Sequence, residues 1–314
     1  MKKLLFLLAL YIYSFSDSHI FVYHRFGDPK HPSTNTSLEH LTTQFEYFKK
    51  NNYIVVPLED ILNKVRKKED IPSNWVALTI DDSFKSFYTN GLPLFKKYNY
   101  PFSIYVYIEA VQRNFKDFTS WDELREINKY GTIGLHSYAH DHLLKISNDE
   151  LIKDTKKALE LFEKNLGFVP DTYVYPYGEY NQRIEDTIKS FGFKAVLNQS
   201  SGSVTKYSDV YDINRIALVG NTNIKHKLRY KTLRMDWIEP KSYPKDGILT
   251  KVVAKVDPKI KKLKLYVTGH GWRDIKVKNG LVNETLNVKL KRTRSRIILG
   301  TDVFTISTKL LIKN

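Results

Sequence analysis

The 314-residue sequence contains no cysteine, which excludes disulfide bonds and thiolate chemistry. Any metal site must therefore be built from histidine, aspartate and glutamate side chains. The sequence also lacks low-complexity tracts and internal repeats. Its hydrophobic content of 42% and charged content of 27% are those of a globular protein, and its length allows one large domain or a large domain with a smaller one.

Long apolar runs are missing too, apart from one short run at the N-terminus. Lys2 and Lys3 precede the apolar residues 4–13, and small residues up to Ser18 follow. This pattern predicts a signal peptide at residues 1–18 and export to the periplasm, the cell surface or the medium. The run is short for a bilayer span. The alternatives are an uncleaved membrane anchor and a buried first strand.

Acidic residues are the minority, with 34 Asp and Glu against 50 Lys and Arg, and the formal net charge is +16. Such an excess favours an anionic neighbour. The lysines are scattered along the chain, however, which is also typical of an ordinary solvated surface. The densest basic cluster, residues 289–296, makes an anionic cell-surface polymer a candidate partner of the C-terminal region. Export argues against nucleic acid as a partner.

Short apolar runs alternate with amphipathic stretches up to about residue 216. The expected strands are residues 20–23, 54–56, 75–80, 101–108, 132–135, 172–175, 195–198 and 212–217. The expected helices are residues 37–51, 58–67, 84–98, 120–129 and 147–166. This alternation predicts an α/β fold with a parallel sheet, a distorted (β/α)7-type barrel over residues 19–234. Functional residues of such barrels follow the carboxyl ends of the strands.

Helical periodicity ends at about Arg234. Pro240, Pro244 and Gly247 indicate a linker at residues 235–247. Period-two alternation then predicts strands at residues 249–256, 263–267, 274–277, 284–290, 296–300 and 303–312. We therefore expect a small accessory β-sandwich over residues 248–314.

Two adjacent carboxylates, Asp81 and Asp82, follow the expected strand at residues 75–80. Neighbouring side chains at a strand end point in different directions, so one can bind a metal while the other faces a substrate. The alternative is a helix N-terminus, where aspartate and serine are common caps.

Two histidines, His136 and His140, follow the next-but-one strand. Histidines four residues apart on one helical turn share a face, so both imidazoles can reach one ion. His142 is two residues farther and points elsewhere, which indicates a surface position or a place outside the ligand set. A third cluster, residues 173–178, combines tyrosines with Pro176 and Gly178 and is either a rigid functional loop or a plain turn.

Together the clusters resemble the polysaccharide deacetylase family, carbohydrate esterase family 4, whose catalytic domain is named for chitooligosaccharide deacetylase homology. Residues 79–83 are similar to its T-F-D-D-G motif, residues 136–140 to H-S/T-x-x-H/D, and residues 174–178 to R-x-P-Y-G. The resemblance extends over roughly residues 20–217.

This resemblance implies a site in which Asp82, His136 and His140 hold a divalent metal, with zinc as first choice. Such a ligand set leaves positions open for water and substrate. Asp81 is implied as the base that takes a proton from a metal-activated water, and the Tyr177 N–H as an oxyanion donor.

The sequence departs from the family motifs in two places. Val174 replaces the arginine that orients the base, and we expect Arg215 to supply this charge. Ser83 replaces glycine, which indicates that no positive φ is needed there. The closest resemblance is to the biofilm-type poly-N-acetylglucosamine deacetylases, whose acid histidine lies near the N-terminus. That implies His24 as the acid, the alternative being a structural histidine.

The sequence therefore predicts a metal-dependent hydrolase that removes N-acetyl groups from an extracytoplasmic N-acetylglucosamine polysaccharide. A poly-β-1,6-N-acetylglucosamine-like polymer is the first choice, and peptidoglycan or another surface glycan is the alternative. A non-catalytic glycan-binding protein on the same scaffold is a second hypothesis. The presence of both Asp81 and His24 argues against it, because binding alone requires neither.

Overall fold

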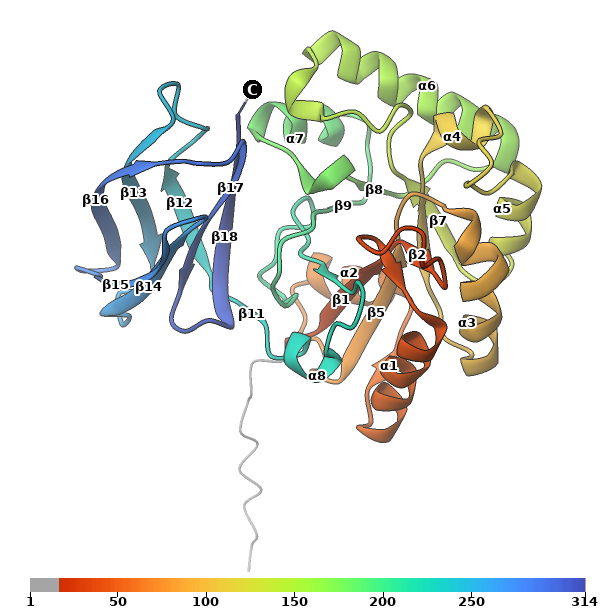
Figure 1. Cartoon of the computed structure of the whole chain (residues 1–314), viewed down its shortest axis with the longest axis horizontal. Coiled ribbons are helices and arrows are strands. Elements are labelled where there is room, and N and C mark those ends of the chain that lie inside the picture. Colours follow the sequence, from red (N-terminus) through yellow and green to blue (C-terminus); the bar gives the residue numbers. More distant parts are fainter. Residues whose placement is uncertain (1–16, 314) are drawn as a thin grey trace, which may run out of the picture.

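The computed structural model describes residues 17–313, which form a barrel domain and an all-β domain (Figure 1). The predicted signal segment lies outside the described residues except at its last two positions. Ser18 exchanges two backbone hydrogen bonds with Val204, so the barrel domain already includes this residue. Within residues 17–313, the helices are too short or too polar to cross a membrane.

The barrel domain is built on a parallel sheet with the strand order β10-β1-β5-β6-β7-β8-β9, and β4 pairs with the start of β5. Its strands are β1 (His19–Tyr23), β4 (Ile54–Val55), β5 (Trp75–Ile80), β6 (Ser103–Val106), β7 (Thr132–Leu135), β8 (Thr172–Val174), β9 (Ala195–Leu197) and β10 (Ile216–Ala217). An isolated bridge from Ile213 to Leu197 and the pairing of β10 with β1 connect the two edges. The expected distorted α/β barrel is confirmed.

Helices cover the outside of this sheet (Figure 1). They are α1 (Leu38–Lys50), α2 (Leu58–Arg66), α3 (Leu92–Tyr98), α4 (Ile108–Gln112), α5 (Trp121–Ile127), α6 (Asn148–Leu166), α7 (Gln182–Lys189) and α8 (Ile224–Lys227). Three short turns are η1 (Phe87–Gly91), η2 (Leu143–Lys145) and η3 (Pro176–Gly178), and a small ribbon pairs β2 (Arg25–Phe26) with β3 (Asn35–Thr36). Ser120 and Ser147 cap α5 and α6 through capping boxes, as their sequence context predicts.

The predicted helix at residues 84–98 is divided in the structure. The π-helical turn η1 precedes α3, and the Leu92 N–H bonds to the Phe87 carbonyl five residues earlier. Pro93 follows at once and has no N–H, so the regular ladder of hydrogen bonds cannot run through this point. The predicted strand at residues 101–108 is also shorter than expected, because Ile108 already begins α4.

The all-β domain is a sandwich of two sheets. One has the order β11 (Lys231–Thr232), β18 (Thr305–Ile312), β17 (Arg294–Gly300), β14 (Lys262–Val267) and β15 (Gly271–Lys276). The other has the order β12 (Met235–Glu239), β13 (Ile248–Val256) and β16 (Leu281–Lys289). β12 lies in the segment expected to be a linker, and β11 lies in the expected barrel. Both strands pair with sandwich strands. The linker between the two domains is therefore shorter than Pro240, Pro244 and Gly247 indicated.

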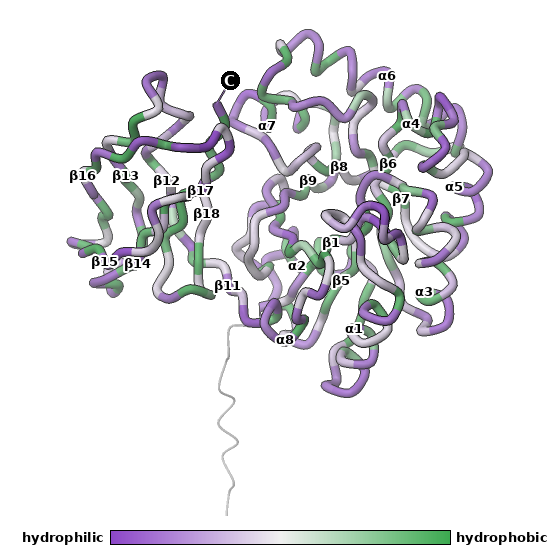
Figure 2. Tube along the Cα trace, viewed as in Figure 1, coloured by the Kyte–Doolittle hydropathy of each residue, from purple (hydrophilic) through white to green (hydrophobic). Residues whose placement is uncertain are grey.

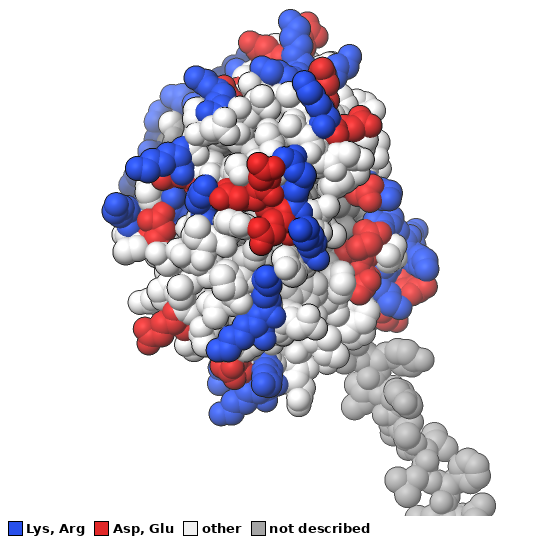
Figure 3. All heavy atoms as spheres, turned by 90° about the vertical axis from the view of Figure 1, so that its right-hand side faces the viewer, with Lys and Arg blue, Asp and Glu red and all other residues white. Residues whose placement is uncertain are grey.

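Hydrophobic and hydrophilic residues alternate along the helices and the sandwich strands (Figure 2). The barrel and the sandwich each have a core of their own, centred on residues such as Phe95 in the first and Leu265 in the second. On the barrel face drawn in Figure 3, lysine and arginine are interspersed with aspartate and glutamate. That mixture is typical of a solvated surface rather than of one anion-binding patch.

Candidate active site

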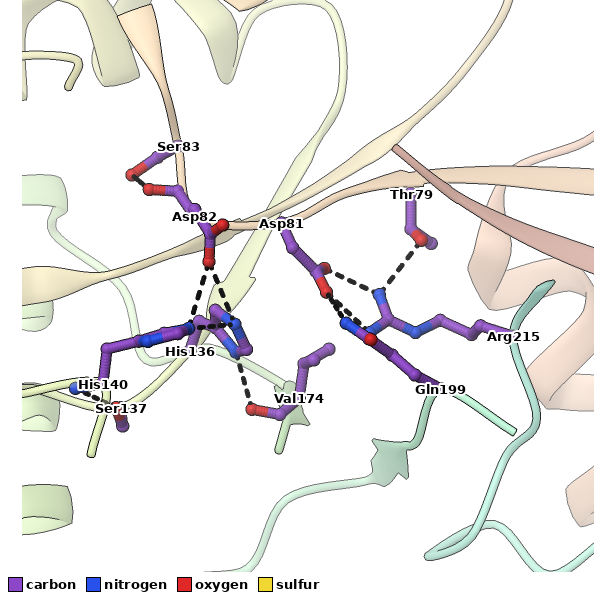
Figure 4. Close-up of polar contacts among 10 residues, drawn as sticks. All are labelled: Thr79, Asp81, Asp82, Ser83, His136, Ser137, His140, Val174, Gln199 and Arg215. Carbon is purple, nitrogen blue, oxygen red and sulfur yellow. Dashed lines mark hydrogen bonds and ion pairs between the residues drawn. The ribbon is translucent and has the colours of Figure 1, made fainter. Parts of the chain in front are cut away.

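The polar residues expected to carry chemistry gather at the carboxyl ends of the barrel strands (Figure 4). Asp81 and Asp82 follow β5, and His136 follows β7. Parallel strands end at the same edge of a sheet, so loops that are far apart in sequence meet there.

Asp82, His136 and His140 form a compact set of three potential ligands. The Oδ1 atom of Asp82 lies 3.3 Å from the Nε2 atom of His136 and 3.2 Å from that of His140. The two Nε2 atoms are 3.1 Å apart. Ligands of one tetrahedral zinc ion, at bonds of about 2.0–2.1 Å, lie about 3.3 Å from one another. The three side chains therefore have the spacing that a divalent cation requires, and the buried Asp82 Oδ1 faces this point.

The spacing of the two histidines predicted one helical turn, but residues 136–140 form a non-helical loop in which Ser137 and His140 have positive φ. This loop is fixed by its own hydrogen bonds. The Nδ1 atom of His136 lies 2.9 Å from the Val174 carbonyl, which makes Nδ1 the protonated nitrogen and leaves Nε2 free as a ligand. The His140 N–H donates to the Ser137 hydroxyl at 2.8 Å. Asp154, on α6, accepts the N–H groups of the two residues between, Tyr138 and Ala139, at 3.0 and 2.7 Å.

Several non-glycine residues around the site have a left-handed backbone. The φ angles are 70° at Asp82, 58° at Ser83, 62° at Ser137, 53° at His140 and 58° at Tyr177. Such conformations cost about 1–2 kcal/mol each in an L-residue and persist only where neighbouring groups hold them.

The expectation of an ordinary backbone at Ser83 is wrong. The residue has a positive φ although it replaces glycine, because local hydrogen bonds hold it. Its hydroxyl donates to the Asp82 carbonyl, and its own carbonyl accepts the Thr119 N–H at 3.0 Å. Serine thus gains a bond here that offsets part of the strain which glycine would avoid.

Asp81 is fully buried and paired with Arg215, as the sequence predicts. Two parallel hydrogen bonds of 2.7 and 2.8 Å join the guanidinium to the two carboxylate oxygens. Burial raises the pKa of Asp81, but the charge of Arg215 and its hydrogen bonds outweigh this effect, so the pKa lies below its ordinary value. Gln199 adds a third donor at 3.1 Å. Asp81 is therefore held as an ion in one orientation.

Arg215 is itself held by the barrel. Its Nε atom donates to the Asn198 carbonyl at 2.9 Å, and one terminal nitrogen also donates to the Thr79 hydroxyl at 3.1 Å. The Tyr105 ring lies 5.5 Å from the guanidinium carbon. The side chain has no exposed surface, and Asp81 is the carboxylate with which it forms an ion pair.

His24 follows β1 and is close to both carboxylates. Burial raises the pKa of Asp81 and of Asp82, and the charge of His24 is among the smaller influences that lower it, after Arg215 at Asp81 and after His136 and His140 at Asp82. Its Nδ1 atom is buried and has no hydrogen-bond partner among the described residues. The histidines farther along the chain lie elsewhere: His226 packs on Phe304, and His270 contacts the Lys289 carbonyl.

Tyr177 lies in η3, directly after β8. Its ring packs edge-on to His140, with ring centres 4.6 Å apart, and stacks on His142 at 4.2 Å. His142 is not a ligand; its Nδ1 atom lies 2.8 Å from a carboxylate oxygen of Glu179. The structure thus brings the third sequence cluster against the metal-ligand pair.

Sequence reasoning missed three residues around the site, Gln199, Glu179 and Arg294. Gln199 follows the end of β9, so the rule that function follows barrel strands could have found it. Glu179 follows η3 and is buried. Arg294 belongs to β17 of the sandwich, 115 residues away from Glu179, and its sequence context gives no sign of the contact.

The sequence was compared with models of known families. The model described as polysaccharide deacetylase matches residues 68–196, which contain the metal-ligand set, Asp81 and Tyr177. This match and the named relatives support the assignment of the chain to the polysaccharide deacetylase family. The chain is accordingly identified as a carbohydrate N-deacetylase, a hydrolase of carbon–nitrogen bonds other than peptide bonds. His24, Gln199, Arg215 and the sandwich lie outside the matched segment.

Named relatives match a longer part of this chain than the family model does. A poly-β-1,6-N-acetyl-D-glucosamine N-deacetylase of Staphylococcus aureus is 27% identical over 222 residues, covering 67% of this chain and 76% of the relative. The enzyme of that name from Escherichia coli is 22% identical over 244 residues, covering 63% of this chain and 35% of the relative.

Solved structures share the fold of this deacetylase. A Streptococcus pyogenes deacetylase, PplD, has a TM-score of 0.63 at 19% identity and covers 69% of this chain and 98% of its own. IcaB from Ammonifex degensii has a TM-score of 0.58 at 21% identity and covers 65% of this chain and 92% of its own. These likenesses confirm the barrel architecture.

Proposed function

We propose that this deacetylase hydrolyses N-acetyl groups of an extracytoplasmic N-acetylglucosamine polysaccharide in a metal-dependent reaction. The observation that carries the proposal is the compact set of Asp82, His136 and His140 directly beside the buried, ionised Asp81. The polymer of first choice is poly-β-1,6-N-acetylglucosamine, supported by the names of the relatives from S. aureus and E. coli. Export is supported by the apolar run at residues 4–13.

The residues present fit a divalent cation, with zinc as first choice. Two imidazoles and one carboxylate are ligands that zinc accepts, and three protein ligands leave room for water and substrate. A cation bound there would supply a Lewis acid for the acetamide carbonyl and would lower the pKa of a neighbouring water. The chain's own part is to hold the two Nε2 atoms and Asp82 Oδ1 at the observed spacing.

Asp81 is the base of the proposed reaction. Its depressed pKa keeps it ionised at neutral pH, and Arg215 and Gln199 fix the direction in which it accepts the proton of the attacking water. The water oxygen bonds to the acetamide carbon, and the carbonyl oxygen becomes an oxyanion. The Tyr177 N–H is the backbone donor proposed to stabilise that charge.

His24 is the proposed acid. When the carbon–nitrogen bond of the intermediate breaks, the departing amine takes a proton from the imidazole, and acetate and a free amino sugar are released. The position of His24 directly after β1, close to both carboxylates, supports this assignment.

Acetate release from defined polymers tests the proposal. Purified protein is incubated with oligomers of β-1,6-linked N-acetylglucosamine, chitin oligomers and peptidoglycan, with and without a chelator. We expect release from the β-1,6-linked oligomers, loss of release with the chelator and recovery when zinc is added back. Release that is insensitive to complete metal removal would contradict metal dependence. Binding without release on every polymer would favour the glycan-binding alternative.

An anionic cell-surface polymer is the proposed additional partner of the basic sandwich. A cleft of about 810 Å³ between the domains combines aromatic side chains, Trp237 and Tyr243, with Lys241, Lys245 and Lys309. We expect Lys241→Glu with Lys245→Glu to weaken sedimentation with an anionic polymer while acetate release from short oligomers stays unchanged. Equal sedimentation of the variant and the parent would contradict this partner.

A further inference from the structure

An arginine of the sandwich domain reaches into the barrel's catalytic loop. Arg294 lies at the start of β17, and one of its terminal nitrogens donates to a carboxylate oxygen of Glu179 at 2.6 Å. The other terminal nitrogen donates to the backbone carbonyl of Tyr177 at 2.8 Å. One guanidinium thus holds two points of the segment that carries the proposed oxyanion donor.

The backbone at Tyr177 needs such support. Its φ and ψ are 58° and 5°, a left-handed conformation inside η3 that a tyrosine adopts only at a cost of about 1–2 kcal/mol. The carbonyl that Arg294 holds belongs to the peptide directly after the Tyr177 Cα atom. Fixing that peptide fixes ψ of Tyr177 and, with the rigid turn around it, the direction of the Tyr177 N–H.

Glu179 extends the same support to the side chains. Its carboxylate is 3% exposed, and a buried carboxylate requires charged or hydrogen-bonded partners. One oxygen accepts from Arg294, and the other contacts the Nδ1 atom of His142 at 2.8 Å. The His142 ring in turn stacks on Tyr177. Arg294 therefore stabilises Tyr177 directly at its backbone carbonyl, and indirectly at its ring through Glu179 and His142.

We propose that Arg294 is a positioning residue for the deacetylation step, through which the sandwich domain holds the oxyanion-binding peptide of Tyr177. This assignment rests on the proposed function, because it requires the Tyr177 N–H to stabilise the transition state. It makes the sandwich part of the catalytic unit rather than an appended module.

A role limited to holding the two domains together is the competing explanation. Other contacts already provide that attachment: Thr232 of β11 bonds to Ser203 through its N–H at 2.9 Å and its hydroxyl at 2.7 Å, and it accepts from Asn214 at 2.9 Å. Arg229 also lies 3.6 Å from the centre of the Phe304 ring. We therefore expect the two domains to stay docked when Arg294 is replaced.

The test compares Arg294→Ala and Arg294→Lys with the parent in the full-length protein. For Arg294→Ala we expect kcat for acetate release to fall about 10- to 100-fold, the size of effect that small displacements of a transition-state donor produce. KM and bound metal stay the same, because Arg294 contacts neither a ligand nor Asp81. Added guanidinium ion is expected to restore part of kcat in Arg294→Ala. The Arg294 side chain is 34% exposed, so solvent can reach the space that its removal leaves.

Arg273→Ala is the matched control. It removes the same charge from the same domain, but Arg273 is exposed on β15, at the opposite edge of the sheet from β11. Its kcat should equal that of the parent. Glu179→Gln, which keeps the shape of the side chain, provides a second route to the same contact and should lower kcat with KM unchanged.

The outcomes separate this inference from the proposed function. If the parent protein releases no acetate from any polymer, the proposed function fails and the role of Arg294 fails with it. If the parent is active and kcat of Arg294→Ala stays within about twofold, only the positioning role is wrong. A variant that loses its thermal transition and is not rescued by guanidinium or by Arg294→Lys would assign Arg294 to domain attachment instead.

Discussion

The candidate metal-binding half and the proposed base half of the site are built in different ways. Asp82, His136 and His140 come from two short segments at strand ends, and their spacing follows from local turns. Asp81 depends instead on Arg215, 134 residues farther along, and on Gln199, 118 residues farther along. Local turns therefore set the spacing of the three potential ligands, whereas long-range packing sets the charge state of the buried Asp81.

The sharpest way to separate the two halves is to remove one residue from each. His136→Ala should lose bound metal and with it acetate release down to background, because two ligands bind a cation poorly. Asp81→Asn should keep the metal and lower kcat by about 10²- to 10⁴-fold, as removal of a general base does. Metal content and initial rates measure both effects. Loss of metal from Asp81→Asn would show that the halves are not independent.

Arg215 provides the next largest effect. Arg215→Ala leaves a buried carboxylate without its counter-charge, so we expect kcat to fall about 10- to 100-fold and unfolding free energy to drop by about 3–5 kcal/mol. Metal content should stay unchanged. Arg215→Met keeps more of the volume and isolates the charge. Denaturant titration and steady-state rates measure the effects, and full activity in either variant would contradict the orienting role.

The pH dependence of stability and of kcat/KM should report on the ion pair between Asp81 and Arg215. The pKa of Asp81 in the fold is below its ordinary value, so the pair stabilises the protein above the unfolded pKa, and this contribution is lost as pH falls through the folded pKa. In Arg215→Met the largest influence that opposes burial is gone, so burial raises the pKa of Asp81 relative to the parent. The acid limb of the kcat/KM profile should then move to higher pH. An unmoved acid limb would mean that another group sets it.

Gln199 should have a smaller effect, because it adds one neutral donor to a carboxylate already held by two charged bonds. We expect Gln199→Leu to lower kcat by less than about tenfold and to leave metal content unchanged. Steady-state kinetics measures the change. A loss as large as that of Arg215→Ala would show that the amide, not the guanidinium, orients Asp81.

Ser83 should show the smallest change, and it tests backbone strain rather than chemistry. Ser83→Gly removes one hydroxyl bond and relieves the left-handed strain, so stability should change by less than about 1 kcal/mol. Ser83→Val places a β-branched residue at a φ of 58° and should cost more. Thermal unfolding of the two variants measures the difference, and equal stability would contradict strain at this position.

The fold and the grouping of Asp82, His136 and His140 were predictable because they depend on local patterns. Apolar runs alternating with helical periodicity predicted the barrel, and histidines at i and i+4 after a strand predicted the pair at positions 136 and 140. The division of the predicted helix at residues 84–98 and the positive φ of Ser83 were missed. Both features depend on which neighbouring groups form individual hydrogen bonds with these residues. Hydrophobic periodicity carries no information about such single bonds.

The contacts of Arg294 and Gln199 were beyond reach for a different reason. A single side-chain pair between residues more than 100 positions apart leaves no periodic or motif signal in one sequence. Arg215 was found only because the resemblance to the family implied a missing charge beside Asp81. The arginine that is missing from the third motif, at Val174, indicated that another residue would have to supply a positive charge.

The sequence by itself determined the chemistry available to this protein: a chain without cysteine, with carboxylates and histidines placed after barrel strands, can build a metal site only from oxygen and nitrogen ligands. Only the tertiary structure determined the charge state and the orientation of the groups that carry this chemistry. Burial and one distant guanidinium set the charge of Asp81, and an arginine from a second domain holds the loop of Tyr177. Residue types and short spacings are local properties of a chain, whereas burial and long-range pairing exist only after the chain has folded.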